Sequence, residues 1–201
     1  MSKLFLISDT HFCHINCLKY ESKRMIYKDK GFSSFEDMII HNWNSVVSDD
    51  DVVIHLGDVF LSVGRYLSEN NIEMNRKDYM MKLMSELKGE KYLVLGNHDN
   101  RFTNSFFKRI GFEDVYDFLI LDDTYLLTHY PLVKHDYQSK NEKLWIDELE
   151  KVVNRNNVEY VIHGHTHSKN VGLKNHFNVS VENIDFTPIE FEKVKEKLKN
   201  I

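Results

Sequence analysis

The chain has 201 residues, of which 42% are hydrophobic and 28% charged, and its formal net charge is −5. A chain of this size and composition can bury a substantial core, and we expect one domain over residues 1–201. The acidic balance and a sequence pI of about 6.1 argue against a general nucleic-acid coat or a binder of anionic membranes, because such proteins neutralise phosphates with clustered Lys and Arg.

The cysteine content and the hydropathy suggest a compartment. Cys13 and Cys17 are too few for a disulfide framework, and their spacing is not that of a CxxC redox or zinc motif. We interpret them as reduced thiols of a cytoplasmic protein. No apolar stretch approaches the roughly 18 residues of a membrane span, and the first core strand begins at once, which leaves no room for a signal peptide. We therefore expect a soluble protein without a membrane partner.

Taken in chain order, the apolar residues predict alternating strands and helices. Strands are expected at 3–7, 52–56, 91–95, 115–121, 125–128, 159–163 and 177–181, with a hairpin turn at Asp122–Asp123. Helices are expected at 35–47, 77–88, 104–110, 142–155 and 191–200. The stretch 60–76 is predicted to be irregular, and 134–141 is predicted to be a polar loop. The Lys- and Glu-rich last helix is expected to present a solvated face.

Five of the apolar runs deliver metal-binding side chains just past their ends. These side chains are Asp9, His11, Asp58, Asn97, His98, His129, His165 and His167. Ligand crevices of open α/β sheets lie at the carboxyl ends of the strands, so we expect these groups to meet. Several polar groups at buried strand ends need a shared partner. Eleven histidines in the chain favour a metal ion as that partner.

The order and spacing of these residues match a known signature. The blocks read Asp9-Thr10-His11, Gly57-Asp58, Gly96-Asn97-His98-Asp99, His129 and Gly164-His165-Thr166-His167. This set resembles the calcineurin-like metallophosphoesterase superfamily, whose signature is DxH, GD, GNH(D/E), H and GHxH. The context around the blocks resembles the compact, single-domain bacterial and phage members. The resemblance implies an α/β fold, a four-layer α-β-β-α sandwich of two mixed sheets with flanking helices.

The resemblance also implies a dinuclear metal centre with assigned ligands. One metal takes Asp9, His11 and His167, the second takes Asn97, His129 and His165, and Asp58 bridges them. Carboxylate and imidazole ligands together suit transition metals, with Mn as the first choice and Fe, Zn, Ni or Mg as alternatives. A bridging hydroxide attacks phosphorus in such centres. His98 is the expected proton donor to the leaving oxygen, and Asp99 matches a position that can orient its imidazole.

Other residues near the motifs have weaker assignments. Arg101 is a candidate phosphate contact because a guanidinium matches phosphate oxygens. His14 is a candidate substrate contact or, equally, a surface loop residue. His55 and His163 lie inside apolar runs and are expected to be hydrogen-bonded core or supporting histidines rather than ligands.

The predicted activity is that of a phosphodiesterase acting on a nucleotide or another small phosphate ester. The alternatives are a nuclease acting on DNA or RNA ends, against which the net charge weighs, a phosphomonoesterase, and a non-catalytic protein-binding scaffold. A scaffold would be expected to lose ligands that this chain retains. Gly57-Asp58 is not continued as GDxxDRG, which argues against a Ser/Thr protein phosphatase. Substrate choice is expected to depend on loops 12–32, 60–76 and 130–141.

Overall fold

The strands of the protein form two mixed sheets. The computed structural model describes residues 2–133 and 139–200. The first sheet, in the order β4-β3-β2-β1-β9, consists of β1 (Leu4–Ile7), β2 (Val52–His55), β3 (Glu90–Val94), β4 (Asp114–Tyr116) and β9 (Ile189–Glu190). The second, in the order β5-β6-β7-β8, consists of β5 (Leu119–Leu121), β6 (Tyr125–Leu127), β7 (Tyr160–His163) and β8 (His176–Asn178). Neighbouring strands are parallel except at β9 and β5.

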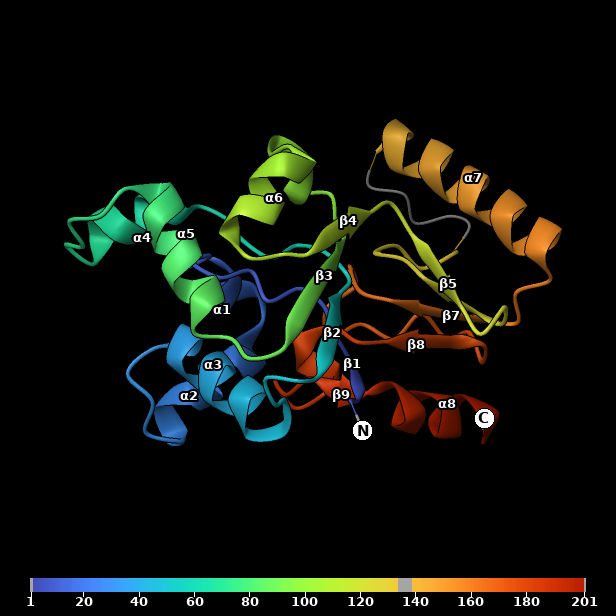
Figure 1. Ribbon diagram of the computed structural model, residues 1–201, viewed down its shortest axis with the longest axis horizontal. Coiled ribbons are helices and arrows are strands. Elements are labelled where there is room, and N and C mark those ends of the chain that lie inside the picture. Colours follow the sequence, from blue (N-terminus) through green and yellow to red (C-terminus); the bar gives the residue numbers. More distant parts are fainter. Residues whose placement is uncertain (1, 134–138, 201) are drawn as a thin grey trace.

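Helices cover the outer faces of both sheets (Figure 1). The first part of the chain contributes α1 (Cys17–Tyr20), η1 (Ser22–Met25), α2 (Ile26–Asp29), α3 (Phe35–Val46), α4 (Val63–Glu69), α5 (Arg76–Ser85), η2 (Asp99–Arg101) and α6 (Asn104–Ile110). The second part contributes α7 (Lys140–Asn156), η3 (Val181–Asn183) and α8 (Phe191–Lys199). Helices α3, α5 and α6 lie on one side of the molecule and α7 on the opposite side.

The alternation of side chains along the strands builds the layers. In β1, Phe5 and Ile7 point into a core shared with α3, α5 and α6, whereas Leu6 points into the space between the sheets. Leu127 and Ile162 reach that same space from the second sheet, and the outer face of the second sheet packs on α7. Burying each such aliphatic side chain contributes roughly 1.5–3 kcal/mol. The two sheets share a core between them and helices pack on their outer faces, which confirms the predicted α-β-β-α sandwich.

Helix α3 shows how local signals agree with the packing. Its cap residue Ser34 accepts a hydrogen bond from the Asp37 backbone N–H at 3.0 Å, which satisfies one of the unpaired donors of the first turn. Met38, Ile39 and Trp43 follow at helical spacing and are buried against the first sheet. The helix ends at Val46, where the next residue is extended.

Three predictions about the elements need correction. Residues 60–76 are not irregular throughout, because they contain α4, which buries only Val63 and Leu67 and so leaves too short a pattern to recognise. The strand expected at 115–121 is divided into β4 and β5, which belong to different sheets. An apolar run keeps its pattern when it leaves one sheet for another, so the division has no local signal. The strand expected at 177–181 is β8, and it ends at Asn178.

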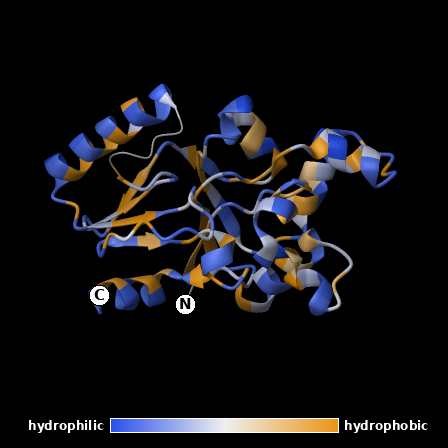
Figure 2. Ribbon diagram, turned by 180° about the vertical axis from the view of Figure 1, so that it is seen from behind, coloured by the Kyte–Doolittle hydropathy of each residue, from blue (hydrophilic) through white to orange (hydrophobic). Residues whose placement is uncertain are grey.

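Helix α8 contributes more to the core than its charged sequence indicates. Phe191, Val194 and Leu198 pack between the sheets, while most Lys and Glu residues of α8 are exposed. Hydrophobic and hydrophilic residues alternate along α8 in Figure 2. The predicted loop over 134–141 lies mostly outside the described residues, and its last two residues begin α7. No helix within residues 2–133 and 139–200 is long and apolar enough to cross a membrane.

Candidate metal centre

The strand ends of both sheets bring the predicted ligands to one edge of the sandwich. Loops after β1, β2 and β3 in the first sheet and after β6 and β7 in the second carry the predicted ligands Asp9, His11, Asp58, Asn97, His129, His165 and His167. The loop after β3 also carries His98, the predicted proton donor. The loops are tied together across the sheet: the Asp9 N–H donates to the Gly57 carbonyl at 3.0 Å, and the His11 N–H donates to the Asp58 carbonyl at 3.0 Å.

The backbone at this edge is strained. Five of the predicted ligands have positive φ, namely Asp9 (57°), His11 (46°), Asp58 (59°), His165 (67°) and His167 (49°). Residues other than Gly adopt this conformation at a cost of about 1–3 kcal/mol each, and such strain concentrates at functional sites. The surrounding hydrogen bonds and packing hold the turns in place, so the side chains are aimed before anything binds.

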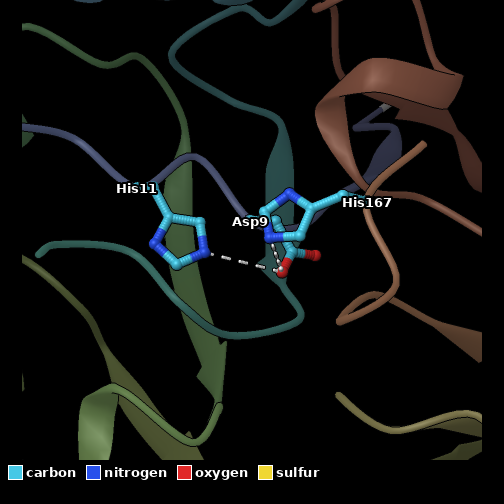
Figure 3. Close-up of side chains that lie close together, drawn as sticks. All are labelled: Asp9, His11 and His167. Atoms are coloured by element: carbon cyan, nitrogen blue, oxygen red, sulfur yellow. Dashed lines mark ion pairs between the residues drawn. The ribbon is translucent and has the colours of Figure 1, made fainter. Parts of the chain in front are cut away.

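Asp9, His11 and His167 form the first group of potential ligands. Their ligand atoms all lie within 4.8 Å of one another, and both imidazoles face the Asp9 carboxylate, with each Nε2 3.9 Å from Asp9 Oδ1 (Figure 3). Asp9 Oδ1 and His11 Nε2 are buried and have no hydrogen-bond partner within the described chain. Buried polar atoms without partners are costly. A cation between these three side chains would satisfy both atoms.

Asn97, His129 and His165 form the second group. Asn97 Oδ1 lies 3.0 Å from His129 Nε2 and 3.1 Å from His165 Nδ1, and the two imidazole nitrogens are 3.2 Å apart. The other ring nitrogen of His129, Nδ1, donates a hydrogen bond to the Leu56 carbonyl oxygen at 2.8 Å. His165 Nε2 lies 3.3 Å from Glu142 Oε1. Such outer partners select the tautomer in which the inner nitrogens are free to bind a metal.

The Asp58 carboxylate lies between the two groups. Its Oδ2 is 3.4 Å from His11 Nε2 in the first group and 3.6 Å from His129 Nε2 in the second. Its Oδ1 accepts a hydrogen bond from the His98 backbone N–H at 2.9 Å. One carboxylate oxygen of Asp58 therefore lies near both groups of potential ligands.

The electrostatics of the centre suit cations. Burial raises the pKa of Asp58, and the neighbouring Asp99 and Asp9 carboxylates act in the same direction. Burial lowers the pKa of His165 to about 3, and burial also lowers the pKa of His11. Metals bind neutral imidazoles and ionised carboxylates. Against the effect of burial, the Asp58 carboxylate raises the pKa of His129, and the hydrogen bond to Glu182 raises that of His167. The centre therefore combines imidazoles that burial keeps neutral with carboxylates that attract positive charge, and these residues fit divalent cations.

His98 and His14 stand at the open side of this cluster. His98 is 32% exposed, and its Nε2 lies 3.9 Å from Asp58 Oδ2. Burial, followed by the positive charge of Arg101, lowers the pKa of His98. The His14 ring lies 5.5 Å from that of His11. Both side chains are thus close enough to meet a substrate bound at the cluster.

Asp99 has contacts other than the expected one. Asp99 Oδ2 accepts hydrogen bonds from the backbone N–H groups of Asp58 at 2.7 Å and Gly96 at 2.9 Å. Its Oδ1 accepts from the Val59 N–H at 3.2 Å. In the described part of the chain its carboxylate makes no hydrogen bond to the His98 imidazole. The geometry shows Asp99 joining the loops after β2 and β3.

Comparison with known proteins is consistent with this geometry. The family model for calcineurin-like phosphoesterases matches residues 2–169. The chain belongs to this family. It is similar to the uncharacterized protein MJ1445 of Methanocaldococcus jannaschii, with 31% identity over 205 residues, 96% of this chain and 89% of the relative. It is also similar to the crystal structure of AQ665, a protein of unknown function from Aquifex aeolicus, with a TM-score of 0.70, 25% identity and coverage of 98% and 99% of the two chains.

This calcineurin-like phosphoesterase has supporting residues that sequence reasoning missed. Arg24 is 1% exposed and donates to the Asp9 carbonyl at 2.6 Å and to the Thr10 carbonyl at 2.9 Å. Its Nε donates to Glu182 Oε1 at 2.6 Å, and the same oxygen lies 3.3 Å from His167 Nδ1. Glu182 directly follows a predicted strand, so the strand-end pattern was a signal for it. Arg24, in the short helix η1, had no such signal.

Glycines of the phosphoesterase motifs let the ligand loops touch. A Cβ on Gly57 would lie 2.5 Å from Gly96 N, and a Cβ on Gly96 would lie 2.6 Å from Asp58 N. On Gly164 it would lie 2.7 Å from Ser8 Cβ and would collide with the Asp9 carboxylate. Gly57 and Gly96 thus let the loops after β2 and β3 pack backbone against backbone, and Gly164 leaves room for the side chains of Ser8 and Asp9.

His55 and His163 lie behind the ligands, as expected of core histidines. Burial lowers the pKa of each to about 3, so both are neutral. His55 Nε2 is 3.0 Å from Thr10 Oγ1, which donates to the Val59 carbonyl. His55 therefore supports the loop that carries Asp9.

Proposed function

We propose that this protein is a dinuclear, metal-dependent phosphodiesterase that hydrolyses a nucleotide or another small phosphate ester. The family and the clustered ligands support a metal-dependent phosphoesterase. The observation that carries the proposal is the position of Asp58 Oδ2 between the two groups of ligands, with the partly exposed His98 beside it. We propose Mn as the physiological ion, with Fe, Zn, Ni and Mg as the alternatives to test.

Two cavities support a substrate with substituents on both sides of the phosphorus. One, the His167 cavity, has a volume of about 490 Å³ and is lined by His165 and His167 themselves. The other, the Arg101 cavity, is also about 490 Å³ and is lined by Phe60 and Arg101, which follow Asp58 and His98 in the chain. A phosphodiester has two ester substituents, and one cavity at His165 and His167 together with a second whose Arg101 acts on His98 supports a diester over a monoester.

The residues of the chain supply binding and proton transfer. Bound cations supply Lewis-acid stabilisation of the phosphoryl charge and activate water. An anionic phosphate next to His98 raises the lowered pKa of this imidazole, because a nearby negative charge favours the protonated form. One phosphorus–oxygen ester bond breaks and the oxygen of water joins phosphorus, with one water proton released to solvent. Protonated His98 gives its proton to the leaving oxygen and is reprotonated from solvent. Asp58 keeps the two groups of ligands at a fixed separation.

The setting of the enzyme is part of the proposal. We propose that residues 1–201 act as one domain in a reducing cytoplasm. The thiols of Cys13 and Cys17 are buried and unpaired, which supports this compartment.

The first test is hydrolysis of bis-p-nitrophenyl phosphate and p-nitrophenyl phosphate by metal-stripped protein resupplied with Mn, Ni, Zn or Mg. We expect diester turnover that depends on added metal. Asp58→Asn is expected to lose both metal binding and turnover. His98→Ala is expected to retain bound metal and to lower kcat by roughly 10²–10⁴-fold, the usual contribution of general acid catalysis. His41→Ala, an exposed histidine of α3, is the control with unchanged rate.

Other outcomes would assign the protein differently. Preference for the monoester would make it a phosphomonoesterase, and preference for oligonucleotide ends would make it a nuclease. Two bound metals without turnover of any ester would indicate a protein-binding scaffold. Equal diester turnover by His98→Ala and the parent protein would refute the proton-donor role.

A further inference from the structure

The Arg101 cavity is built by three segments that lie far apart in the sequence. The loop into α4 contributes Phe60 to Arg65, the start of α5 contributes Arg76, Lys77 and Met80, and the segment from η2 into α6 contributes Arg101, Phe102 and Phe106. Helices α4, α5 and α6 lie side by side in Figure 1. Phe60 follows Asp58 by two residues and Arg101 follows His98 by three, and the charge of Arg101 acts on the His98 imidazole, so this wall of the cavity lies near the candidate metal centre.

Positive charge gathers around this cavity. Arg65, Arg76, Lys77 and Arg101 line it, and no Asp or Glu of the described chain does. Arg65 is paired with Glu69 at 2.6 Å. The other three form no ion pair within residues 2–133 and 139–200. The whole chain has a net charge of −5, so the cavity is locally positive on a protein that is negative overall. Cations such as Arg76, Lys77 and Arg101, which face one cavity without a counterion in the described chain, favour an anionic ligand.

The Arg76 guanidinium occupies the space that a side chain at position 64 would fill, which Gly64 leaves open. A Cβ on Gly64 would lie 2.6 Å from the Arg76 Cζ atom, so the guanidinium packs directly on the backbone of α4. The exposed Arg76 side chain thus lies at the wall of the cavity, next to Gly64. A planar guanidinium at this position matches phosphate oxygens and can form two parallel hydrogen bonds to them.

An aromatic face lies beside the cations. The rings of Phe102 and Phe106 are stacked, with centroids 4.5 Å apart and an interplanar angle of 13°. Phe102 is 36% exposed and lines the cavity. An exposed phenyl ring next to guanidinium groups is the combination that binds a nucleobase by stacking and its phosphates by charge.

We propose that the Arg101 cavity is a subsite for a nucleotide part of the substrate. A planar base would stack on Phe102, and a further phosphate would be bound by Arg76, Lys77 and Arg101. The subsite rests on the proposed function, because it assigns the substrate class of that same centre: a small phosphodiester that contains a base and at least one more phosphate. A volume of about 490 Å³ is that of a small-molecule pocket and sets the size of the ligand to a single nucleotide.

The test uses binding, so that it does not depend on turnover. The probe is adenosine 5′-(α,β-methylene)diphosphate, which is not hydrolysed between its phosphorus atoms, titrated calorimetrically into the Mn-loaded protein. We expect Arg76→Gln and Phe102→Ala each to weaken binding at least tenfold. Arg109→Gln, a cation of α6 that is outside the lining, is the matched control and should bind as the parent protein does. Lys77→Gln replaces Arg76→Gln if that variant does not fold.

Each other result has a defined meaning. Equal affinity in the variants and the parent protein would overturn the subsite, and so would methylenediphosphonate binding as tightly as the nucleotide, because the base would then contribute nothing. A decathymidylate that binds at least tenfold tighter and weakens in the same variants would replace the proposal with a nucleic-acid groove. If nucleotide binding follows the expected pattern but no diester is hydrolysed, the subsite stands and the proposed phosphodiesterase activity fails.

Discussion

At the scale of single residues, the centre depends on a buried ion pair behind its ligands. Arg24 and Glu182 are 1% and 5% exposed, and their 2.6 Å contact links the carbonyl of Asp9 to the imidazole of His167. One ion pair therefore contacts two of the three residues of the first group, the backbone of Asp9 and the side chain of His167, although neither partner is in a motif. Removing one partner leaves the other charge buried without compensation.

Glu182→Gln tests this role. We expect the variant to lose about 3–5 kcal/mol of unfolding free energy, the cost of breaking a buried pair. We expect its metal affinity to fall by about 10–100-fold, because His167 loses an oriented partner. Urea unfolding and metal titration measure the two effects. Glu148→Gln breaks the exposed pair with Lys151 and should change stability by less than about 1 kcal/mol. Similar losses in both variants would contradict the role.

A buried acid in α3 predicts a dependence of stability on pH. Glu36 accepts a hydrogen bond from the Cys13 N–H at 2.8 Å, and burial raises its pKa. When folding raises the pKa of a carboxyl group, the free energy of unfolding falls as the pH increases from the unfolded-state pKa through the folded-state pKa. Glu36→Gln keeps the acceptor and removes the charge. In urea unfolding, its stability relative to the parent protein should therefore increase as the pH rises above the unfolded Glu pKa of about 4.3, and a constant difference would refute the prediction.

At the scale of the elements, the loops after the strands position the ligands. Two of them meet where Gly164 passes Ser8 and Asp9 without room for a side chain. The His165 N–H donates to Asp9 Oδ2 across this contact at 2.9 Å. The contact joins the two sheets at the candidate metal centre, so a change in one loop is transmitted to ligands on the other.

Gly164→Ala is expected to separate these loops. The added Cβ must displace Ser8 or the Asp9 carboxylate, at a cost of about 1–3 kcal/mol for overpacking, and metal binding should weaken because Asp9 moves. The control is Gly172→Ala, where a Cβ meets nothing within 4 Å although φ is +72°. It should lose stability through backbone strain alone and bind metal normally. Metal titration of both variants distinguishes the two causes, and normal binding by Gly164→Ala would contradict the argument.

At the scale of the whole molecule, the two sheets share the ligands between them. The first sheet supplies Asp9, His11, Asp58 and Asn97, and the second supplies His129, His165 and His167. Bound cations therefore connect the two sheets as well as the two groups of ligands. A ligand that binds only the folded state stabilises it by mass action.

Metal binding is accordingly expected to raise the melting temperature. At a free Mn concentration of about 100 Kd, each site contributes about 2.7 kcal/mol, which for a chain of this size corresponds to roughly 5–10 °C. Differential scanning fluorimetry of stripped and Mn-loaded protein measures the shift. Asp58→Asn should lose most of it, whereas Asp50→Asn, in an exposed turn, should retain it. An equal shift in both variants would mean that Mn acts elsewhere.

The sequence by itself determined the fold class and the set of candidate ligands. Asp9, Asp58 and His165 each follow an apolar run within a few residues, and this local relation survives in the structure because parallel strands end at the same edge of a sheet. The core positions of α3 were likewise readable, since helical spacing and burial are periodic along the chain.

Only the tertiary structure decided what supports and surrounds these ligands. Arg24 and Glu182 are 158 residues apart, the strand expected at 115–121 divides between two sheets, and the Arg101 cavity combines three separate segments. The physical reason is the same in each case. A local pattern reports which face of an element is buried, whereas a contact between distant segments depends on how complete elements pack, and no spacing along the chain encodes that distance.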